Sequence, residues 1–262
     1  MNAGIIGLQD WFESPAGAYL LAWEQQKLDL AVVDIFGYHA LQLGLPALDA
    51  LAANRMPHRW LATAEGVHSS RAALQADYAA LPFPESSLDL VVLPHALDSH
   101  VDPHAVLREV ARVLVPGGRV VVSGFNPASL WGLRQGCEHL CRRFDVGKPL
   151  LPQGLDFIGS RRLRDWLRLL DFEVETGGYG CYRPLLASDK WLQRWRWMDR
   201  AGARWWSFFG AAYVLVAVKR VHGVRLLEPA WRKAGSKAAA TVPLARRGSS
   251  DNPLSMKQER HE

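Results

Sequence analysis

The chain has 262 residues, of which 49% are hydrophobic and 22% charged, a composition that suits one large α/β domain or two small ones. Its longest largely apolar run, 205–218, is too short to span a bilayer, and its N-terminus lacks the layout of a signal peptide. Three cysteines do not make a disulfide framework, so we expect a cytoplasmic protein with reduced thiols.

The net charge of +5 is unevenly distributed along the chain. Residues 224–262 hold eight Lys/Arg and four Asp/Glu, so this segment carries +4 and the remainder is close to neutral. A near-neutral body argues against a fold built to bind nucleic acid, which would carry a basic stripe. Because the segment has few large apolar residues, we expect a disordered tail, with RNA binding by the tail as a less favoured alternative.

The first half of the chain predicts one helix followed by three short strands. In "SPAGAYLLAWEQQKLDLAVVDIFG", Ser14 is suited to the N-cap and Pro15 to the first helical position, with Gly37 as the stop. The apolar residues between them form a broad helical face. Strands are expected at 41–43, 59–63 and 73–76.

The middle of the chain predicts a strand–helix–strand unit. "LDLVVL" (88–93) is typical of a strand covered on both faces, and Asp102 caps a helix whose first residue is Pro103. The "PGG" turn at 116–118 ends that helix, and "RVVVSG" (119–124) is the next strand. A crossover of this length makes the two strands parallel neighbours.

The second half adds a helical insertion, a further helix and two strands. Residues 127–159 are irregular around one helix, "SLWGLRQGCEHLCRRF", and Ser160 is expected to cap the helix "RRLRDWLRLL". "FEVETGG" (172–178) and "AAYVLVAVKRV" (211–221) complete the strands. Because helices alternate with strands over most of 14–221, we predict a doubly wound, Rossmann-like α/β domain over 1–223.

A resemblance to a known family rests on the stretch "ADYAALPFPESSLDLVVLPHALDSHVDPHAVLREVARVLVPGGRVVVSG". This stretch is similar to the middle of the class I S-adenosylmethionine-dependent methyltransferases, specifically the methyltransferase type-11 domain, and the resemblance covers about Trp11 to Val221. "SGFNPASLWGLR" and "GGYGCYRPLL" resemble a proteobacterial branch of unidentified substrate. The resemblance implies a seven-stranded, mostly parallel sheet with the last strand antiparallel, and S-adenosylmethionine as the cofactor.

Ligands of such sheets bind at the carboxyl ends of the strands, and the resemblance implies roles for the residues expected there. Asp77 would accept a hydrogen bond from the adenine amino group, with the backbone of the next two residues beside the ring. Gly44 stands for the first glycine of the family's glycine loop, the 94–95 turn for the methionine end, and Glu65 for the ribose-binding acid. The implied cofactor-binding residues are Gly44, Glu65, Asp77, Tyr78, Ala79, Pro94 and His95.

The glycine loop departs from the family pattern. The family has an acid near Gln42 and further glycines near Pro46 and Leu48, which let the backbone approach the ligand and supply N–H donors. Leu45 and Leu48 bring side chains instead, and Pro46 has no N–H. These departures predict one of three outcomes: weak binding of the donor, donor binding that the substrate strengthens, or a protein without catalytic activity.

Further polar residues near the expected site have more than one interpretation. His95 is either a general base for the acceptor or a packed histidine whose backbone does the work. Asp98 and His100, in the same loop, are expected to be solvated. The motif "CEHLC" (137–141) falls on a helix with no fourth ligand evident, so we predict no metal site.

The segment 189–206, "DKWLQRWRWMDRAGARWW", combines tryptophans with arginines. We favour one amphipathic helix that packs its tryptophans on the domain. The alternative is a docking helix beside the acceptor, engaging the substrate, RNA or a membrane surface. On that alternative the contacting residues are Trp191, Trp195, Arg196 and Arg200; Met198, Gly202 and Trp205 share the tryptophan face and Arg204 the arginine face.

The favoured function is an S-adenosylmethionine-dependent methyltransferase that acts on an unidentified small-molecule acceptor by in-line displacement, with positioning as the main source of catalysis. One alternative is a binding protein on the same fold with a degenerate donor site. Another is an RNA methyltransferase, which the near-neutral body disfavours.

Overall fold

The computed structural model describes residues 8, 11–67, 69–142, 155–186 and 188–220, with the side chains of 137–142 excepted. The predicted tail at 224–262 and part of the predicted insertion at 127–159 lie outside these residues. Each described helix is too short or too polar to cross a membrane.

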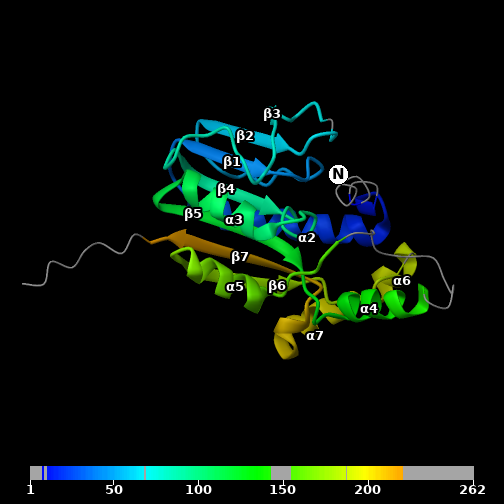
Figure 1. The fold of residues 1–262 in the computed structure, drawn as a ribbon. Helices are drawn as coiled ribbons and strands as arrows, with labels where there is room; N and C mark the ends of the chain where they lie inside the picture. The colour runs from blue at the N-terminus through cyan, green and yellow to red at the C-terminus, as the bar shows by residue number, and fades with distance from the viewer. Residues whose placement is uncertain (1–7, 9–10, 68, 143–154, 187, 221–262) are drawn as a thin grey trace, which may run out of the picture. The chain divides into compact units, whose positions relative to one another are not determined.

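A seven-stranded sheet forms the centre of the described domain, in the order β3-β2-β1-β4-β5-β7-β6 (Figure 1). Neighbours from β3 to β5 pair in parallel, whereas β7 runs antiparallel to both β5 and β6. This topology confirms the predicted fold class, including the antiparallel last strand. The strands are β1 His39–Leu43, β2 His58–Thr63, β3 Leu74–Gln75, β4 Leu88–Pro94, β5 Leu114–Phe125, β6 Phe172–Gly180 and β7 Ala212–Lys219.

Helices begin where the sequence supplies a cap. The Ser14 hydroxyl accepts a hydrogen bond from the Gly17 N–H at the start of α2, and the Asp102 carboxylate accepts one from the Ala105 N–H at the start of α3. Ser160 is the first residue of α5 rather than its cap, since its hydroxyl bonds to the Tyr179 hydroxyl instead. The helices are α2 Pro15–Val32, α3 Pro103–Val113, α4 Leu130–Arg142, α5 Ser160–Leu169, α6 Asp189–Arg194 and α7 Trp197–Trp205, with a short 3-10 turn, η1 Ser207–Phe209.

Apolar side chains leave the central strands alternately to the two faces of the sheet. On one face, residues such as Leu41, Val91 and Val120 form a core with α3 and α5. On the other face, residues such as Val92 and Val121 form a second core with α2. Both faces are therefore covered, as the continuous apolar run of β4 predicts.

Two predicted boundaries shift. The first helix ends at Val32, short of Gly37. The 116–118 turn lies inside β5 rather than before it: Leu88 pairs with Leu114 and Leu90 with Arg119, so the residues between form a bulge in β5.

The doubly wound pattern is incomplete in the first half of the sheet. Residues 44–57, all of them described, connect β1 to β2 through turns with no helix. The described residues between β2 and β4 likewise form turns around β3. This agrees with the sequence prediction of three short strands after the first helix, and helices alternate with strands from β4 onward.

Candidate active site

The carboxyl ends of the parallel strands meet at one edge of the sheet. Because β7 is antiparallel, its first residue, Ala212, pairs with the last residues of β5 and β6, Phe125 and Gly180. The connection from β6 to β7 therefore starts and finishes at this edge, and Figure 1 shows α4, α6 and α7 beyond it. Ligands of doubly wound sheets bind at this edge.

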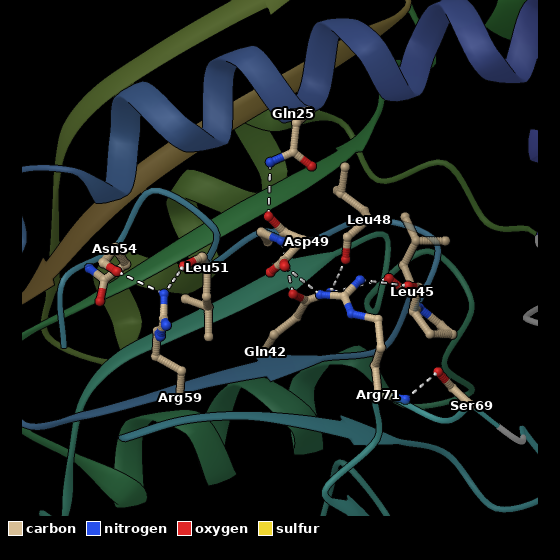
Figure 2. A network of polar contacts seen from close by, with 12 residues as sticks. Gln25, Gln42, Leu45, Leu48, Asp49, Leu51, Asn54, Arg59, Ser69 and Arg71 are labelled. Atoms are coloured by element: carbon tan, nitrogen blue, oxygen red, sulfur yellow. Dashed lines mark hydrogen bonds and ion pairs between the residues drawn. The ribbon is translucent and has the colours of Figure 1, made fainter. Parts of the chain in front are cut away.

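The loop after β1, residues 44–57, is held by one buried side chain and is called the β1 loop below. The Gln42 amide nitrogen donates to the carbonyl oxygens of Gly44, Leu45 and Leu48 at 3.1, 3.1 and 2.8 Å, and its oxygen accepts from the Ala50 N–H at 2.9 Å (Figure 2). Gly44 and Leu45 have φ values of +81° and +45°, which turn the chain sharply enough for this closure. The Gln42 side chain therefore holds the β1 loop in its closed conformation from inside.

Two arginines hold the outer side of the β1 loop. Arg71 donates to the Pro46 carbonyl at 3.0 Å and pairs with the Asp49 carboxylate at 2.7 Å. Arg59 donates to the carbonyls of Leu51 and Asn54 at 3.2 and 3.0 Å (Figure 2). A cavity of about 390 Å³ lies between the loop and β2, and both arginines line it. The loop is thus fixed from inside and outside by side chains of the neighbouring strands and loop.

The leucines of the β1 loop pack away from the predicted adenine side. Leu45 and Leu48 are buried in the core that the sheet forms with α2.

Tyr78 lies across the tips of β1 and β2. Its ring is buried, and a Cβ built on Gly44 would stand 3.1 Å from its hydroxyl oxygen. The hydroxyl lies near the Ala64 backbone, yet within the described part of the chain it has no partner with hydrogen-bonding geometry. Burial raises the pKa of this phenol. The sequence predicted only a backbone role for Tyr78, whereas its side chain covers the predicted donor site.

Asp77, by contrast, projects into solvent at the tip of β3. Its side chain is 64% exposed, and its Oδ1 accepts a hydrogen bond from the Ala79 N–H at 3.0 Å. His100 Nε2 lies 3.5 Å from the same oxygen, and the His100 ring stacks on Tyr78. The turn that Asp77 makes with Ala79 orients the carboxylate without consuming both of its oxygens.

His95 is enclosed between two carboxylates. Its Nδ1 lies 3.0 Å from Asp98 Oδ2, and its Nε2 lies 2.7 Å from Oε1 of Glu24, a residue of α2. Burial lowers the pKa of His95, but the two carboxylates outweigh burial and raise it to about 10. Both ring nitrogens of His95 are therefore engaged, and the two carboxylates favour its protonated form.

This geometry does not suit the general-base interpretation of His95, because neither nitrogen is free for an acceptor. It corresponds to the alternative, a packed histidine. The prediction that Asp98 is solvated is wrong: its side chain is buried, accepts from the Phe125 N–H at 3.0 Å, and burial raises its pKa. His100, with 14% of its side chain exposed, is not a solvated loop residue either.

The other predicted residues are more dispersed. Pro94 is buried as the last residue of β4 and pairs with Ser123. Glu65 follows β2 and is exposed. Glu24 was missed by sequence reasoning, although an acid on the apolar face of the first helix, four residues after Leu20, was a readable signal.

Comparison with known proteins identifies the family of this fold. The model of a methyltransferase domain family matches residues 47–122. The uncharacterized protein YafS of Escherichia coli (strain K12) is 34% identical over 171 residues, which cover 65% of this chain and 67% of that protein.

The chain belongs to the class I S-adenosylmethionine-dependent methyltransferases.

Other similar proteins are more distant. A ubiquinone biosynthesis O-methyltransferase of Xanthomonas oryzae pv. oryzae is 30% identical over 130 residues, 45% of this chain and 52% of that protein, so the chain spans about half of that relative. Solved S-adenosylmethionine-dependent methyltransferases from Thermotoga maritima and Archaeoglobus fulgidus give TM-scores of 0.53 and 0.51 at 14% identity. They cover 77% and 76% of this chain, and 93% and 94% of their own, and show the shared fold.

S-adenosylmethionine is the cofactor of this methyltransferase family, and the strand ends fit it unevenly. On the predicted adenine side, Asp77 offers an exposed carboxylate at the tip of β3, which suits a hydrogen bond from an amino group. The glycine-loop side does not fit in this conformation. The N–H groups of Gly44, Leu48 and Ala50 bond to Ala62, Leu45 and Gln42, so these donors are already used.

A second cavity lies among the helices at the carboxyl edge of the sheet. Its volume is about 380 Å³, and its lining is almost wholly apolar. It lies among α4, α7 and η1, the elements that follow β5 and β6 along the chain. The lining residues are Ala128, Leu130, Leu133, Tyr182, Met198, Gly202, Trp206 and Phe209.

Proposed function

We propose that the protein transfers a methyl group from S-adenosylmethionine to an apolar small-molecule acceptor. The apolar cavity of about 380 Å³ carries this proposal, because it lies at the edge of the sheet where Asp77 is exposed and is large enough for an aromatic or short aliphatic molecule. In this proposal Asp77 holds the adenine from the tip of β3.

The buried state of His95 is compatible with such a reaction. Methyl transfer from a sulfonium is an in-line displacement, which correct positioning of the two reactants can accelerate without a general base. His95 then acts on the scaffold: with Glu24 and Asp98 it ties α2 to the turn after β4 and to β5.

Product formation with defined acceptors tests the proposal. The protein is incubated with S-adenosylmethionine and a panel of phenols and aromatic amines of increasing apolarity, and S-adenosylhomocysteine is quantified. Activity should rise with acceptor apolarity and fall at least about tenfold in Met198→Asp, which places a charge in the cavity. Leu169→Asp, on an exposed leucine of α5, is the matched control. Equal activity in both variants would overturn the assignment of the acceptor site.

A second function is favoured by the closed β1 loop, namely a binding protein whose donor site has decayed. The Gln42 side chain bonds to the backbone of the predicted glycine loop, and the Tyr78 ring fills the space beside Gly44, where the donor is expected to bind. Binding of S-adenosylhomocysteine separates the two functions, since a decayed site would not bind it at millimolar concentration.

A further inference from the structure

The segment 197–209, which comprises α7 and η1, leaves five large aromatic side chains exposed. Their exposed fractions run from 43% for Phe209 to 73% for Trp205. Single exposed apolar residues are common, but a contiguous group on a monomer marks an interaction site. This group, called the aromatic surface below, consists of Trp197, Trp205, Trp206, Phe208 and Phe209.

Three members of the aromatic surface, Trp206, Phe208 and Phe209, lie together in space, while Trp197 and Trp205 stand on the same short helix, α7. The rings of Phe208 and Phe209 lie 4.3 Å apart, and Trp206 and Phe209 line the same apolar cavity together with Met198. The cavity therefore opens among the exposed aromatic residues.

The fold holds α7 without using these aromatic side chains. Asp199 pairs with Arg183 at 2.8 Å and accepts a hydrogen bond from the Tyr19 hydroxyl, which anchors one side of the helix. Gly202 packs so closely on Tyr182 that a Cβ would clash with the ring. The prediction of one helix with buried tryptophans is thus wrong. The segment breaks at Trp195 and Arg196, and its anchoring contacts face inward while most tryptophans face out.

Arginines occur in and just before the segment that carries the aromatic surface. Arg194, Arg196, Arg200 and Arg204 are exposed, and none of them forms an ion pair with another described residue. Of the two carboxylates in 189–209, Asp199 is neutralised by Arg183 and only Asp189 is exposed. Surfaces that combine aromatic residues with neighbouring arginines are typical of proteins that bind the interface of an anionic bilayer.

We propose that the aromatic surface and these four arginines dock the protein on an anionic lipid bilayer. Tryptophan and phenylalanine side chains enter the headgroup region, and the arginines contact lipid phosphates. The cavity beside Trp206 and Phe209 then opens toward the acyl chains, so an apolar molecule enters it from the bilayer. The docking itself does not depend on methyl transfer, so the two proposals can fail separately.

Sedimentation with vesicles tests the docking. Full-length protein is mixed with vesicles of phosphatidylcholine alone and of phosphatidylcholine with phosphatidylglycerol, at low and at high salt. The protein should sediment with the anionic vesicles, and high salt should weaken this binding. The double variant Trp205→Ser, Phe208→Ser should lower the partition coefficient about tenfold or more, and Arg200→Glu, Arg204→Glu should lower it by a similar factor.

The matched control is Phe36→Ser, Tyr38→Ser. These two aromatic residues are 71% and 72% exposed just before β1, at the amino end of the strand, and their loss should leave vesicle binding unchanged. The tail at 224–262 is present in every variant, so its charge cancels from the comparison.

The proposal fails if the wild-type protein does not bind anionic vesicles, or if the docking and control variants bind them equally. Retention of single-stranded RNA that is lost in the docking variants, without vesicle binding, would assign the surface to RNA instead. A dimer in sedimentation equilibrium that the docking variants abolish, without vesicle binding, would assign it to a second copy of the chain.

Discussion

The Tyr78 hydroxyl faces Gly44 across the tips of two strands, 3.1 Å from where a Cβ of that glycine would stand. A residue after β3 thus covers the backbone after β1, at the position predicted for the glycine loop. The hydroxyl has no hydrogen-bond partner in the described structure, although it is buried. Such an arrangement is costly for folding unless a ligand state uses it.

The unpartnered hydroxyl predicts an unusual response to its removal. Tyr78→Phe should leave the free energy of unfolding unchanged or raise it by about 1 kcal/mol, because a buried polar atom without a partner is deleted. Tyr213→Phe is the matched control: its buried hydroxyl donates to the Ile158 carbonyl at 2.9 Å, and its loss should cost about 1–3 kcal/mol. Urea denaturation of both variants checks this, and equal destabilisation would contradict the structure around Tyr78.

Removing the whole Tyr78 ring should affect ligand binding in the opposite direction from stability. Tyr78→Ala should cost about 3–5 kcal/mol of stability, as other large-to-small core substitutions do. It should also tighten S-adenosylhomocysteine binding by about tenfold, because the ring no longer has to leave the site before the ligand enters. Calorimetry on the folded variant measures this, and weaker binding would show that the ring supports the ligand rather than blocks it.

Gln42, which holds the β1 loop from inside, gives a pH-dependent prediction. Gln42→Glu turns a carboxyl group toward three carbonyl oxygens, so burial and repulsion should raise its pKa in the folded state. The variant should lose about 3 kcal/mol or more near pH 8 and less near pH 5, where the carboxyl group is protonated more often. Gln26→Glu, on the exposed side of α2, should show neither effect in the same denaturation series.

His95 predicts a loss of stability at alkaline pH. Its folded-state pKa of about 10 lies above the unfolded value of about 6.5, so its contribution is complete below about pH 6.5 and disappears as the pH rises toward 10. His95→Gln should lower stability by about 3–5 kcal/mol near neutral pH, because it leaves Glu24 and Asp98 buried without the cation. It should also flatten the decline in stability between neutral pH and pH 10. An unchanged slope in the variant would mean that His95 is neutral in the folded protein.

Features encoded within a few residues could be predicted from the sequence. The caps at Ser14 and Asp102 depend on hydrogen bonds to N–H groups three residues away, and both are present. The parallel pairing of β4 and β5 followed from the length of the crossover between them.

Features that depend on side chains meeting from distant elements could not be predicted in the same way. Glu24 reaches His95 across 71 positions of sequence, and no local pattern links them. Tyr78 could have pointed to solvent as Asp77 does; only the arrangement of the first three strands shows that it points inward. The sequence spacing of the tryptophans in 189–206 fits a buried helical face. In the structure, however, the contacts of Asp199 and Gly202 determine which side of α7 faces the domain.

Calorimetric titration of S-adenosylhomocysteine into the wild-type protein and Asp77→Asn tests most directly whether the strand ends hold the cofactor from the adenine side. Asp165→Asn on α5 is the matched control, because its side chain is 71% exposed, close to the 64% of Asp77. We predict measurable binding of S-adenosylhomocysteine to the wild-type protein. Asp77→Asn should weaken this binding about tenfold or more, because one charge-assisted hydrogen bond is lost, and Asp165→Asn should leave it unchanged. No binding to the wild-type protein at millimolar ligand, or equal binding by Asp77→Asn and the control, would contradict it.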